Sequence, residues 1–209
     1  MLSHYEQLSD DQQQVLKQTA IFGRPFIVEE MKSLFGTQWE SKYLEVLDEL
    51  RIQGLFDTVG FAPSPIYAYV NTILPESIYR TILHSEKVKL HNLIAEFFER
   101  KFLSDNSKFC SFIAYHYVCA ENKDTMFLWS KNAASIYLKQ GSYEQCRFFL
   151  QKIADYSEDS NEVCAAELGI IETYLWQSDN ERASSILKKY SFLLDLPELT
   201  LSQQALFDK

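Results

Sequence analysis

Residues 137–150 read Y-L-K-Q-G-S-Y-E-Q-C-R-F-F-L, and residues 174–187 read Y-L-W-Q-S-D-N-E-R-A-S-S-I-L. The two stretches share four features at a spacing of 37 positions: Tyr137 and Tyr174, Gly141 and Ser178, Cys146 and Ala183, and Leu150 and Leu187. A fixed period of about 20–50 residues is typical of repeat proteins, whose units bury their apolar faces against their neighbours. We therefore predict two helical hairpins, with turns at 140–142 and 177–179.

The segments around these stretches also have helical patterns. We expect a helix at 109–119, followed by hairpins that pair 125–139 with 143–155 and 161–176 with 180–193. Nothing in 104–209 has the alternation of a strand. Residues 199–209 are typical of the first turns of a new helix, where a third repeat would begin, so we expect the chain to be a fragment of a longer protein.

The first half of the chain is predicted to hold three helices and a β-hairpin. Ser9 is a favourable N-cap for the first helix, which Gly23-Arg24-Pro25 ends. Further helices are expected at about 28–35 and 40–53, and β-like segments at 55–59 and 67–70 flank a turn-rich loop. This order of elements predicts a winged helix-turn-helix.

Two trailing helices are expected before the domain boundary. Pro75 suits the first position of a helix at 76–83, and a longer helix follows at 85–102. The polar stretch 103–107 is the best candidate boundary. We therefore expect a mainly α chain, with a winged-helix domain at 1–103 and an α-α superhelix of repeats at 104–209.

Composition indicates a folded protein with an acidic surface. Of 209 residues, 46% are hydrophobic and 14% aromatic, which is typical of a globular chain. The net charge of −9 disfavours sequence-independent nucleic-acid binding, because phosphates would be repelled. No apolar run is long enough to span a membrane. Four cysteines without a C-x-x-C pair indicate reduced core residues of a cytoplasmic protein.

The hairpins resemble degenerate tetratricopeptide (TPR) repeats. They share an aromatic residue in the first helix, a small turn residue, and a small residue where the helices cross, namely Cys146 and Ala183. A small side chain there lets the two helices approach closely. The resemblance implies a scaffold for protein interaction.

The first half is similar to the winged-helix segment that follows the nucleotide-binding domain of signalling (STAND-type) ATPases. The stretches that carry the resemblance are L-S-D-D-Q-Q-Q-V-L-K-Q-T-A-I-F-G-R-P-F (8–26), L-D-E-L-R-I-Q-G-L-F (47–56), Y-V-N-T-I-L-P-E-S-I-Y-R-T-I-L (69–83) and K-L-H-N-L-I-A-E-F-F-E (89–99). A winged helix followed by degenerate repeats occurs in bacterial ATP-dependent regulators and in soluble adenylyl cyclases. The resemblance implies a role in signal transduction and cAMP biosynthesis, with ATP bound elsewhere in the parent.

Asn71 stands where this family usually has a histidine that faces the bound nucleotide's phosphates. The resemblance therefore makes Asn71 a candidate phosphate-sensing, cofactor-binding residue. Asn can donate a hydrogen bond but cannot carry a positive charge. The alternative is an Asn at the end of a strand that shapes a turn.

Motifs for catalysis and for metal binding are not found. The chain has no G-x-x-x-x-G-K-[ST] loop and no G-x-S-x-G elbow, so we expect no catalytic residue and no cofactor site of its own. Cys110, His116 and Cys119 are the nearest approach to a zinc set, but positions 110 and 116 lie on different faces of a helix. We interpret them as packed helix residues.

Two features of the sequence are candidates for binding surfaces. The third helix of a winged helix often binds in the major groove of DNA. Here that helix carries four acidic and two basic residues, which phosphates would repel: Glu40, Lys42, Glu45, Asp48, Glu49 and Arg51. Nucleic acid is therefore not an expected partner. Trp129 and Trp176 are candidate partner-binding residues, because tryptophan is enriched at the energetic centres of interfaces.

These observations favour a non-catalytic regulatory segment of a multidomain ATPase or nucleotide cyclase, with a soluble adenylyl cyclase-like parent preferred on resemblance. Its partners would be the upstream ATPase module of the same chain or other proteins. A membrane is not an expected partner. The alternative is a free-standing TPR-type adaptor. A transcriptional regulator is the third hypothesis.

Overall fold

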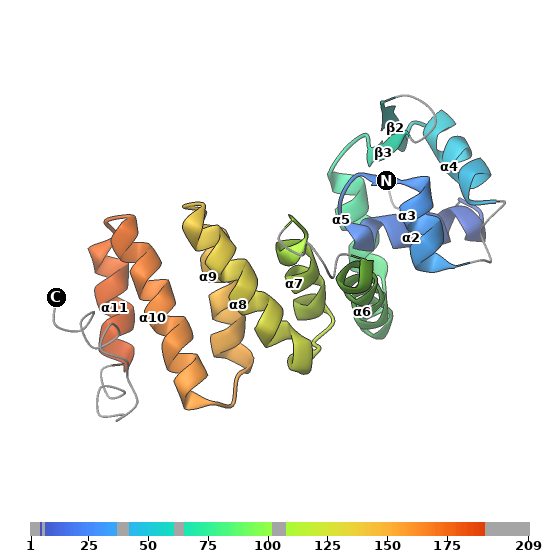
Figure 1. Cartoon of the computed structure of the whole chain (residues 1–209). Coiled ribbons are helices and arrows are strands. Elements are labelled where there is room, and N and C mark those ends of the chain that lie inside the picture. Colours follow the sequence, from blue (N-terminus) through green and yellow to red (C-terminus); the bar gives the residue numbers. More distant parts are fainter. Residues whose placement is uncertain (1–4, 6, 37–41, 61–64, 102–107, 191–209) are drawn as a thin grey trace. The chain divides into compact units, whose positions relative to one another are not determined.

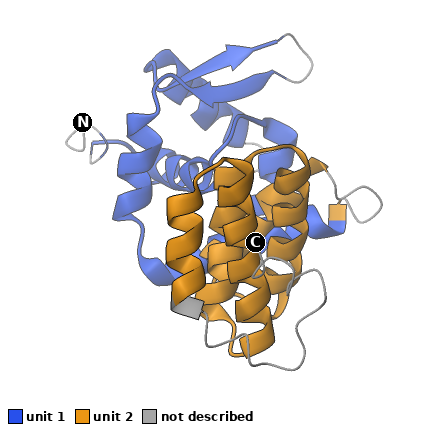
Figure 2. Ribbon diagram, turned by 90° about the vertical axis from the view of Figure 1, so that its left-hand side faces the viewer, with its two compact units in different colours: residues 1–100 blue, residues 101–209 orange. Residues whose placement is uncertain are grey.

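The chain is mainly helical with one small sheet, as predicted, and its computed structural model describes residues 5, 7–36, 42–60, 65–101 and 108–190 (Figure 1). It divides into two compact units, unit 1 of residues 1–100 and unit 2 of residues 101–209 (Figure 2). The expected boundary segment, 103–107, lies outside the described residues.

Helix α2 (Asp10–Phe22) begins and ends where the sequence predicts. Ser9 Oγ accepts from the Gln12 amide at 3.3 Å, and the Gln12 side chain accepts from the Ser9 amide at 3.1 Å, which makes a capping box. Gly23, at φ 71°, ends the helix in the left-handed region, where a side chain would be strained.

Helices α3 (Val28–Phe35) and α4 (Tyr43–Ile52) complete the first three-helix set. The residues that face inward from them are fully buried, namely Met31, Tyr43, Leu47 and Leu50. Helix α3 has the predicted bounds. The predicted start of α4 at Glu40 lies outside the described residues.

The sheet of unit 1 has three antiparallel strands in the order β1-β3-β2: β1 (Phe26–Ile27), β2 (Phe56–Val59) and β3 (Ile66–Tyr69). The predicted hairpin of β2 and β3 is confirmed, with Phe56 opposite Tyr69. Strand β1 was not predicted. Phe26 lies opposite Tyr67, and their rings are stacked 5.9 Å apart, so an aromatic pair holds this two-residue strand.

Helices α5 (Ile73–Thr81) and α6 (His84–Lys101) follow the sheet. The prediction that Pro75 occupies the first helical position is wrong, because α5 begins two residues earlier. Asn71 Oδ1 accepts a hydrogen bond from the Leu74 amide at 2.9 Å. It therefore caps the helix from the position before the N-cap residue, Thr72. Proline is tolerated within a first turn, where amide groups have no partner inside the helix.

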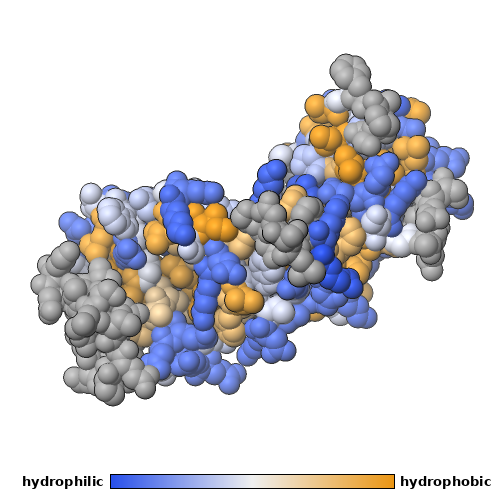
Figure 3. Space-filling model, in the orientation of Figure 1, coloured by the Kyte–Doolittle hydropathy of each residue, from blue (hydrophilic) through white to orange (hydrophobic). Residues whose placement is uncertain are grey.

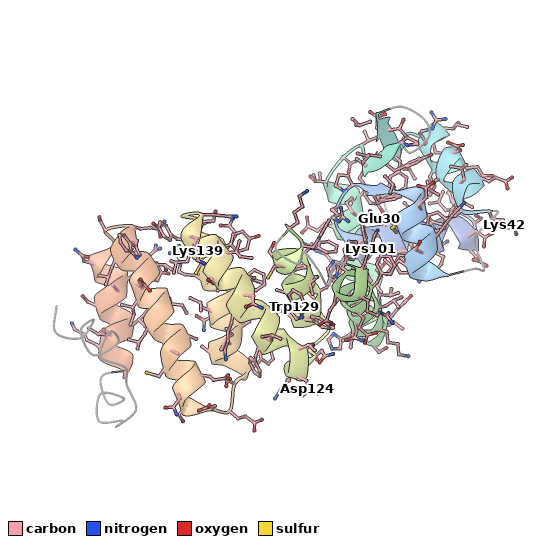
Figure 4. The ribbon with its side chains drawn as sticks, viewed as in Figure 1. Glu30, Lys42, Lys101, Asp124, Trp129 and Lys139 are labelled. Carbon is pink, nitrogen blue, oxygen red and sulfur yellow. The ribbon has the colours of Figure 1, made fainter. Side chains whose placement is uncertain are left out.

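Unit 2 is a succession of helices, each of which packs on the next along the chain (Figure 1). They are α7 (Cys110–Cys119), α8 (Lys123–Lys139), α9 (Tyr143–Tyr156), α10 (Ser160–Trp176) and α11 (Asn180–Tyr190). Asp124 lies in the first turn of α8 and Lys139 in its last turn (Figure 4). Both charges oppose the partial charge at their helix end, which stabilises α8.

The two predicted turns are confirmed and have the same geometry. Gly141 has φ 71° and Ser178 has φ 60°, so both lie in the left-handed region. The next amide bonds back to the repeated tyrosine in each turn, Ser142 N to Tyr137 O and Asp179 N to Tyr174 O, both at 2.9 Å. The 37-residue spacing therefore repeats as structure.

The contact between α9 and α10 joins the two hairpins. A Cβ atom at Gly169 would lie 2.9 Å from Leu150 Cδ1, so glycine allows the helices to meet there. Arg147 Nη1 donates to Thr173 Oγ1 at 3.1 Å and to Gln177 Oε1 at 2.7 Å. Its guanidinium also lies 4.3 Å from the centre of the Tyr174 ring.

On the face that Figure 3 shows, apolar side chains are interspersed among hydrophilic ones. Among the described residues, none of the helices combines the length and the apolar character needed to cross a lipid bilayer.

Candidate functional site

Asn71 lines a pocket of about 360 Å³ at the end of strand β3. The pocket is formed by the end of α2, the turn after it, and the start of α5: Thr19, Gly23, Arg24, Pro25, Phe26, Ala68, Tyr69, Asn71, Thr72 and Pro75. Asn71 is exposed, and its Oδ1 is engaged in capping α5. The side-chain amide Nδ2 is thus the Asn71 group left to donate to a ligand.

A hydrogen-bond network fixes the wall of this pocket. The Tyr69 hydroxyl donates to Leu16 O at 3.0 Å and lies 2.7 Å from Thr19 Oγ1. Thr19 Oγ1 also lies 2.9 Å from Val15 O. Burial raises the pKa of Tyr69 far above its usual value, so the phenol stays neutral and cannot act as a base near neutral pH.

Arg24 is the cation of this pocket, and its charge is already compensated. Its Nη2 lies 3.2 Å from Glu30 Oε1, on the neighbouring helix α3, where Figure 4 labels Glu30. Its guanidinium also lies 4.8 Å from the Phe22 ring centre and 5.2 Å from that of Phe98. A phosphate would therefore compete with Glu30 for this guanidinium.

Trp129 lies in the interior of unit 2. Its side chain is 5% exposed on α8 (Figure 4), and Cys110 Sγ lies 4.0 Å from the Trp129 backbone oxygen. The buried indole offers almost no area to a partner. The sequence suggests both tryptophans equally, because tryptophan is largely buried on average and is also enriched at the energetic centres of interfaces.

Trp176, in contrast, is 65% exposed and lines a second pocket, of about 660 Å³. The pocket lies between α10 and α11 and is formed by Ile171, Glu172, Leu175, Trp176, Asn180, Ala183, Ser184 and Leu187. Trp176 Nε1 donates to Glu172 Oε1 at 3.4 Å, which orients the indole. An exposed, oriented indole at the edge of an apolar pocket is suited to binding a protein partner.

The structure also shows a surface that the sequence analysis missed, which we call the aromatic stripe: Tyr115, Phe148, Lys152 and Tyr156. The Tyr115 ring on α7 lies 6.4 Å from the Phe148 ring on α9. Lys152 Nζ lies 5.8 Å from the Phe148 ring centre and 5.9 Å from that of Tyr156. The three rings are 43%, 39% and 37% exposed.

A spacing of four residues puts the α9 members on one face of the helix, and this signal is present in the sequence. The sequence does not show that Tyr115 belongs to the stripe, because its position depends on how α7 packs. Phe149, the neighbour of Phe148, is buried, and the two rings meet edge to face at 5.1 Å. The exposed ring is thereby held in place by the core.

The four cysteines are protonated at neutral pH, and all but the half-buried Cys119 lie in the core. Burial raises the pKa of Cys110 to about 11 and also raises the pKa values of Cys119, Cys146 and Cys164. His116 is buried, with the Phe112 ring centre 4.4 Å from its own. Within the described ranges, no three side chains of His, Cys, Asp or Glu gather as a metal site requires.

No protein-family model, curated protein or solved structure matches this chain.

Proposed function

We propose that the chain is a non-catalytic regulatory and interaction segment, in which unit 1 is a winged helix-turn-helix and unit 2 begins an α-α superhelix of degenerate TPR-like hairpins. The element order α2-β1-α3-α4-β2-β3 and the antiparallel β2-β3 hairpin support the first assignment. Buried small residues at equivalent positions of the two hairpins, Cys146 and Ala183, support the second.

The aromatic stripe carries the proposal of a binding role. Three partly exposed rings and one lysine form a continuous surface over α7 and α9, with exposed area available to a partner. Aromatic side chains supply large contact area at small entropic cost and are enriched in interfaces. Lys152 would direct a carboxylate of the partner between the rings. The stripe therefore fits a protein segment that carries apolar and acidic residues.

The test of this role uses a matched pair of variants. Phe148→Ala removes the central ring of the stripe, whereas Leu128→Ala removes a side chain that is 60% exposed on α8 and is not part of the stripe. Proteins captured from a lysate by the wild-type chain should be lost with Phe148→Ala and kept with Leu128→Ala, at equal helical content. Equal capture by both variants would exclude the stripe as the binding surface.

The regulatory part of the proposal places this chain after a nucleotide-binding module in a cytoplasmic, soluble adenylyl cyclase-like protein that acts in cAMP signalling. ATP would be bound by that module. Leu47 and Leu50 are fully buried, so α4 can act on another module only through exposed residues such as Ile52, which is 78% exposed. In the parent protein, Ile52→Asp should change ATP turnover or cyclase output. Leu83→Asp, at a residue that is 71% exposed, serves as the control.

Two other functions make different predictions. A free-standing adaptor would need only residues 104–209, and partner capture would be its whole function. The regulatory segment would also need unit 1, whose variant Ile52→Asp would change the output of the parent protein. A transcriptional regulator would retain DNA in a salt-sensitive manner. Exposed Glu45 and Glu49 on α4 oppose that function because they would face the phosphates.

A further inference from the structure

The sheet of unit 1 has one face that packs on the core and one that faces away from it. The core face carries four aromatic rings in successive contacts, with centres between 4.5 and 5.9 Å apart: Phe26, Phe56, Tyr67 and Tyr69. Because side chains alternate along a strand, the residues between these rings project from the opposite side. We call that side the outer face, and it consists of Ile27, Asp57, Val59, Ile66, Ala68 and, directly after β3, Val70.

The outer face is apolar and accessible, on a hairpin that Figure 2 shows at the outside of unit 1. Val59 is 63% exposed, Val70 58% and Ile66 42%. Ile66 lies opposite Val59 on one side and Ile27 on the other, so three β-branched side chains form a row across the sheet. An antiparallel sheet with one face in water normally carries polar residues on that face. An apolar outer face is instead typical of a surface that another protein covers.

Asp57 is the one charged residue of the outer face. It is exposed and lies opposite Ala68 in the hairpin. Its Oδ1 accepts a hydrogen bond from the Thr58 amide at 2.7 Å, which orients the carboxylate. In the part of the chain that the structure describes, no cation pairs with Asp57. A partner that covers the outer face must therefore supply a group that balances this charge, because an unpaired carboxylate is costly to bury.

We propose that the outer face docks a protein segment that presents aliphatic side chains around one lysine or arginine. The cationic group of this residue pairs with Asp57, and its methylene groups lie along Val59. The net charge of −9 also favours a basic partner. A two-fold contact between two copies of this chain would bring two Asp57 carboxylates together, so a second copy does not fit. The outer face belongs to unit 1, so this inference goes beyond the role proposed for the aromatic stripe.

The hydrogen bond between Asp57 and Thr58 also decides how the segment docks. Strand β2 is an edge strand, so its outward backbone groups could in principle pair with an added strand. The Thr58 amide is already bonded to Asp57 Oδ1, and an added strand would have to displace that carboxylate. The segment therefore binds through side chains on the outer face and does not extend the sheet.

The test selects peptides from a displayed random library on the full chain. Those that a Val59→Thr/Ile66→Thr double variant releases are kept, since threonine retains the strand preference and reduces the apolar area. We expect the kept peptides to carry lysine or arginine among aliphatic residues and to bind the double variant at least about tenfold more weakly. Leu83→Thr is the matched control, because Leu83 is 71% exposed in unit 1 and is not part of the outer face. Its binding should equal that of the wild type.

Charge variants test the pairing with Asp57. Asp57→Asn keeps an acceptor for the Thr58 amide and removes the charge, so it should weaken the kept peptides at least about tenfold. Asp57→Lys should weaken them further, and replacing the basic residue of a peptide by glutamate should restore its binding to this variant. NMR signals of the α2 amides check that each variant is folded. Phe148→Ala should bind as the wild type does, so that failure of this inference and failure of the aromatic stripe can be distinguished.

Several results would overturn the inference. They are kept peptides without a basic residue, equal binding by the wild type and Asp57→Asn, and a library that yields no peptide sensitive to the double variant. A dimer of the wild-type chain that the double variant dissociates would also overturn it, because a second copy would then occupy the outer face.

Discussion

Lowering the pH should destabilise unit 1 through one buried histidine, His91. Its side chain is fully buried on α6, and Nε2 lies 3.0 Å from the hydroxyl of Tyr79 on α5. Burial, and to a smaller extent the positive charge of nearby Lys87, lower the pKa of His91 from 6.5 to about 4. Lys87 Nζ lies 4.5 Å from the Tyr79 ring centre. His91 is therefore neutral in the folded chain at neutral pH.

The sign and the size of the effect follow from proton linkage. Between pH 6.5 and about 4 the unfolded chain binds a proton at His91 that the folded chain does not bind. The free energy of unfolding therefore falls as the pH falls through this range, and it is independent of His91 above pH 6.5. The full effect is about 3 kcal/mol at about 1.4 kcal/mol for each pKa unit, and most of it is lost by pH 4.5. That is a large part of the roughly 5–15 kcal/mol that stabilises a typical domain.

The measurement compares the wild-type chain with His91→Gln, whose amide can still bond to the Tyr79 hydroxyl but does not titrate. Urea denaturation, followed through the NMR signals of the α6 amides, gives the free energy of unfolding at pH 7.5 and 4.5. The wild type should lose about 2–3 kcal/mol more than the variant over this interval. An NMR titration of the His91 ring with a midpoint near 6.5, or equal losses in the two proteins, would refute the reasoning.

Two further predictions concern the junctions of unit 2. Ser178→Gly should raise the free energy of unfolding by up to about 1 kcal/mol, because Ser178 is held at φ 60°. The reverse change, Gly141→Ser, should lower the free energy of unfolding by a similar amount. Thermal unfolding of both variants checks this prediction, and a destabilised Ser178→Gly variant would contradict it. Arg147→Met should cost about 1–3 kcal/mol, since it removes the hydrogen bonds to Thr173 and Gln177 and the contact with Tyr174. Arg182→Met is the control, because the Arg182 guanidinium lies 5.8 Å from the centre of the Tyr174 ring and is largely exposed. An equal loss of stability in the two variants would show that the hydrogen bonds of Arg147 do not join the hairpins.

The candidate binding surfaces were only partly visible in the sequence. The sequence gives no reason to prefer Trp129 or Trp176, yet the first is 5% and the second 65% exposed, because the packing around each position decides its burial. The aromatic stripe requires Tyr115 and Phe148 to meet, although 33 positions separate them. Such a meeting depends on the packing of α7 against its neighbours, and helical periodicity carries no information on that packing.

Local backbone chemistry was predicted well where it depends on residues close in the chain. Ser9 starts helix α2, Gly23 ends it, and Gly141 forms the turn between α8 and α9. Each effect involves only hydrogen bonds and torsion angles within a few residues. The turn at Glu121, with φ 53° and a bond from Asn122 N to Tyr117 O, repeats this geometry without a turn-forming residue, and it was missed.

The sequence by itself determined the helical class, most helix positions and the 37-residue repeat, because capping, periodicity and turn residues act over one or two helical turns. Only the tertiary structure decided that β1 joins the sheet and which tryptophan faces the solvent. These outcomes depend on contacts between segments that are distant in the chain. Burial and pairing at each position are set by those neighbours and not by the residue alone.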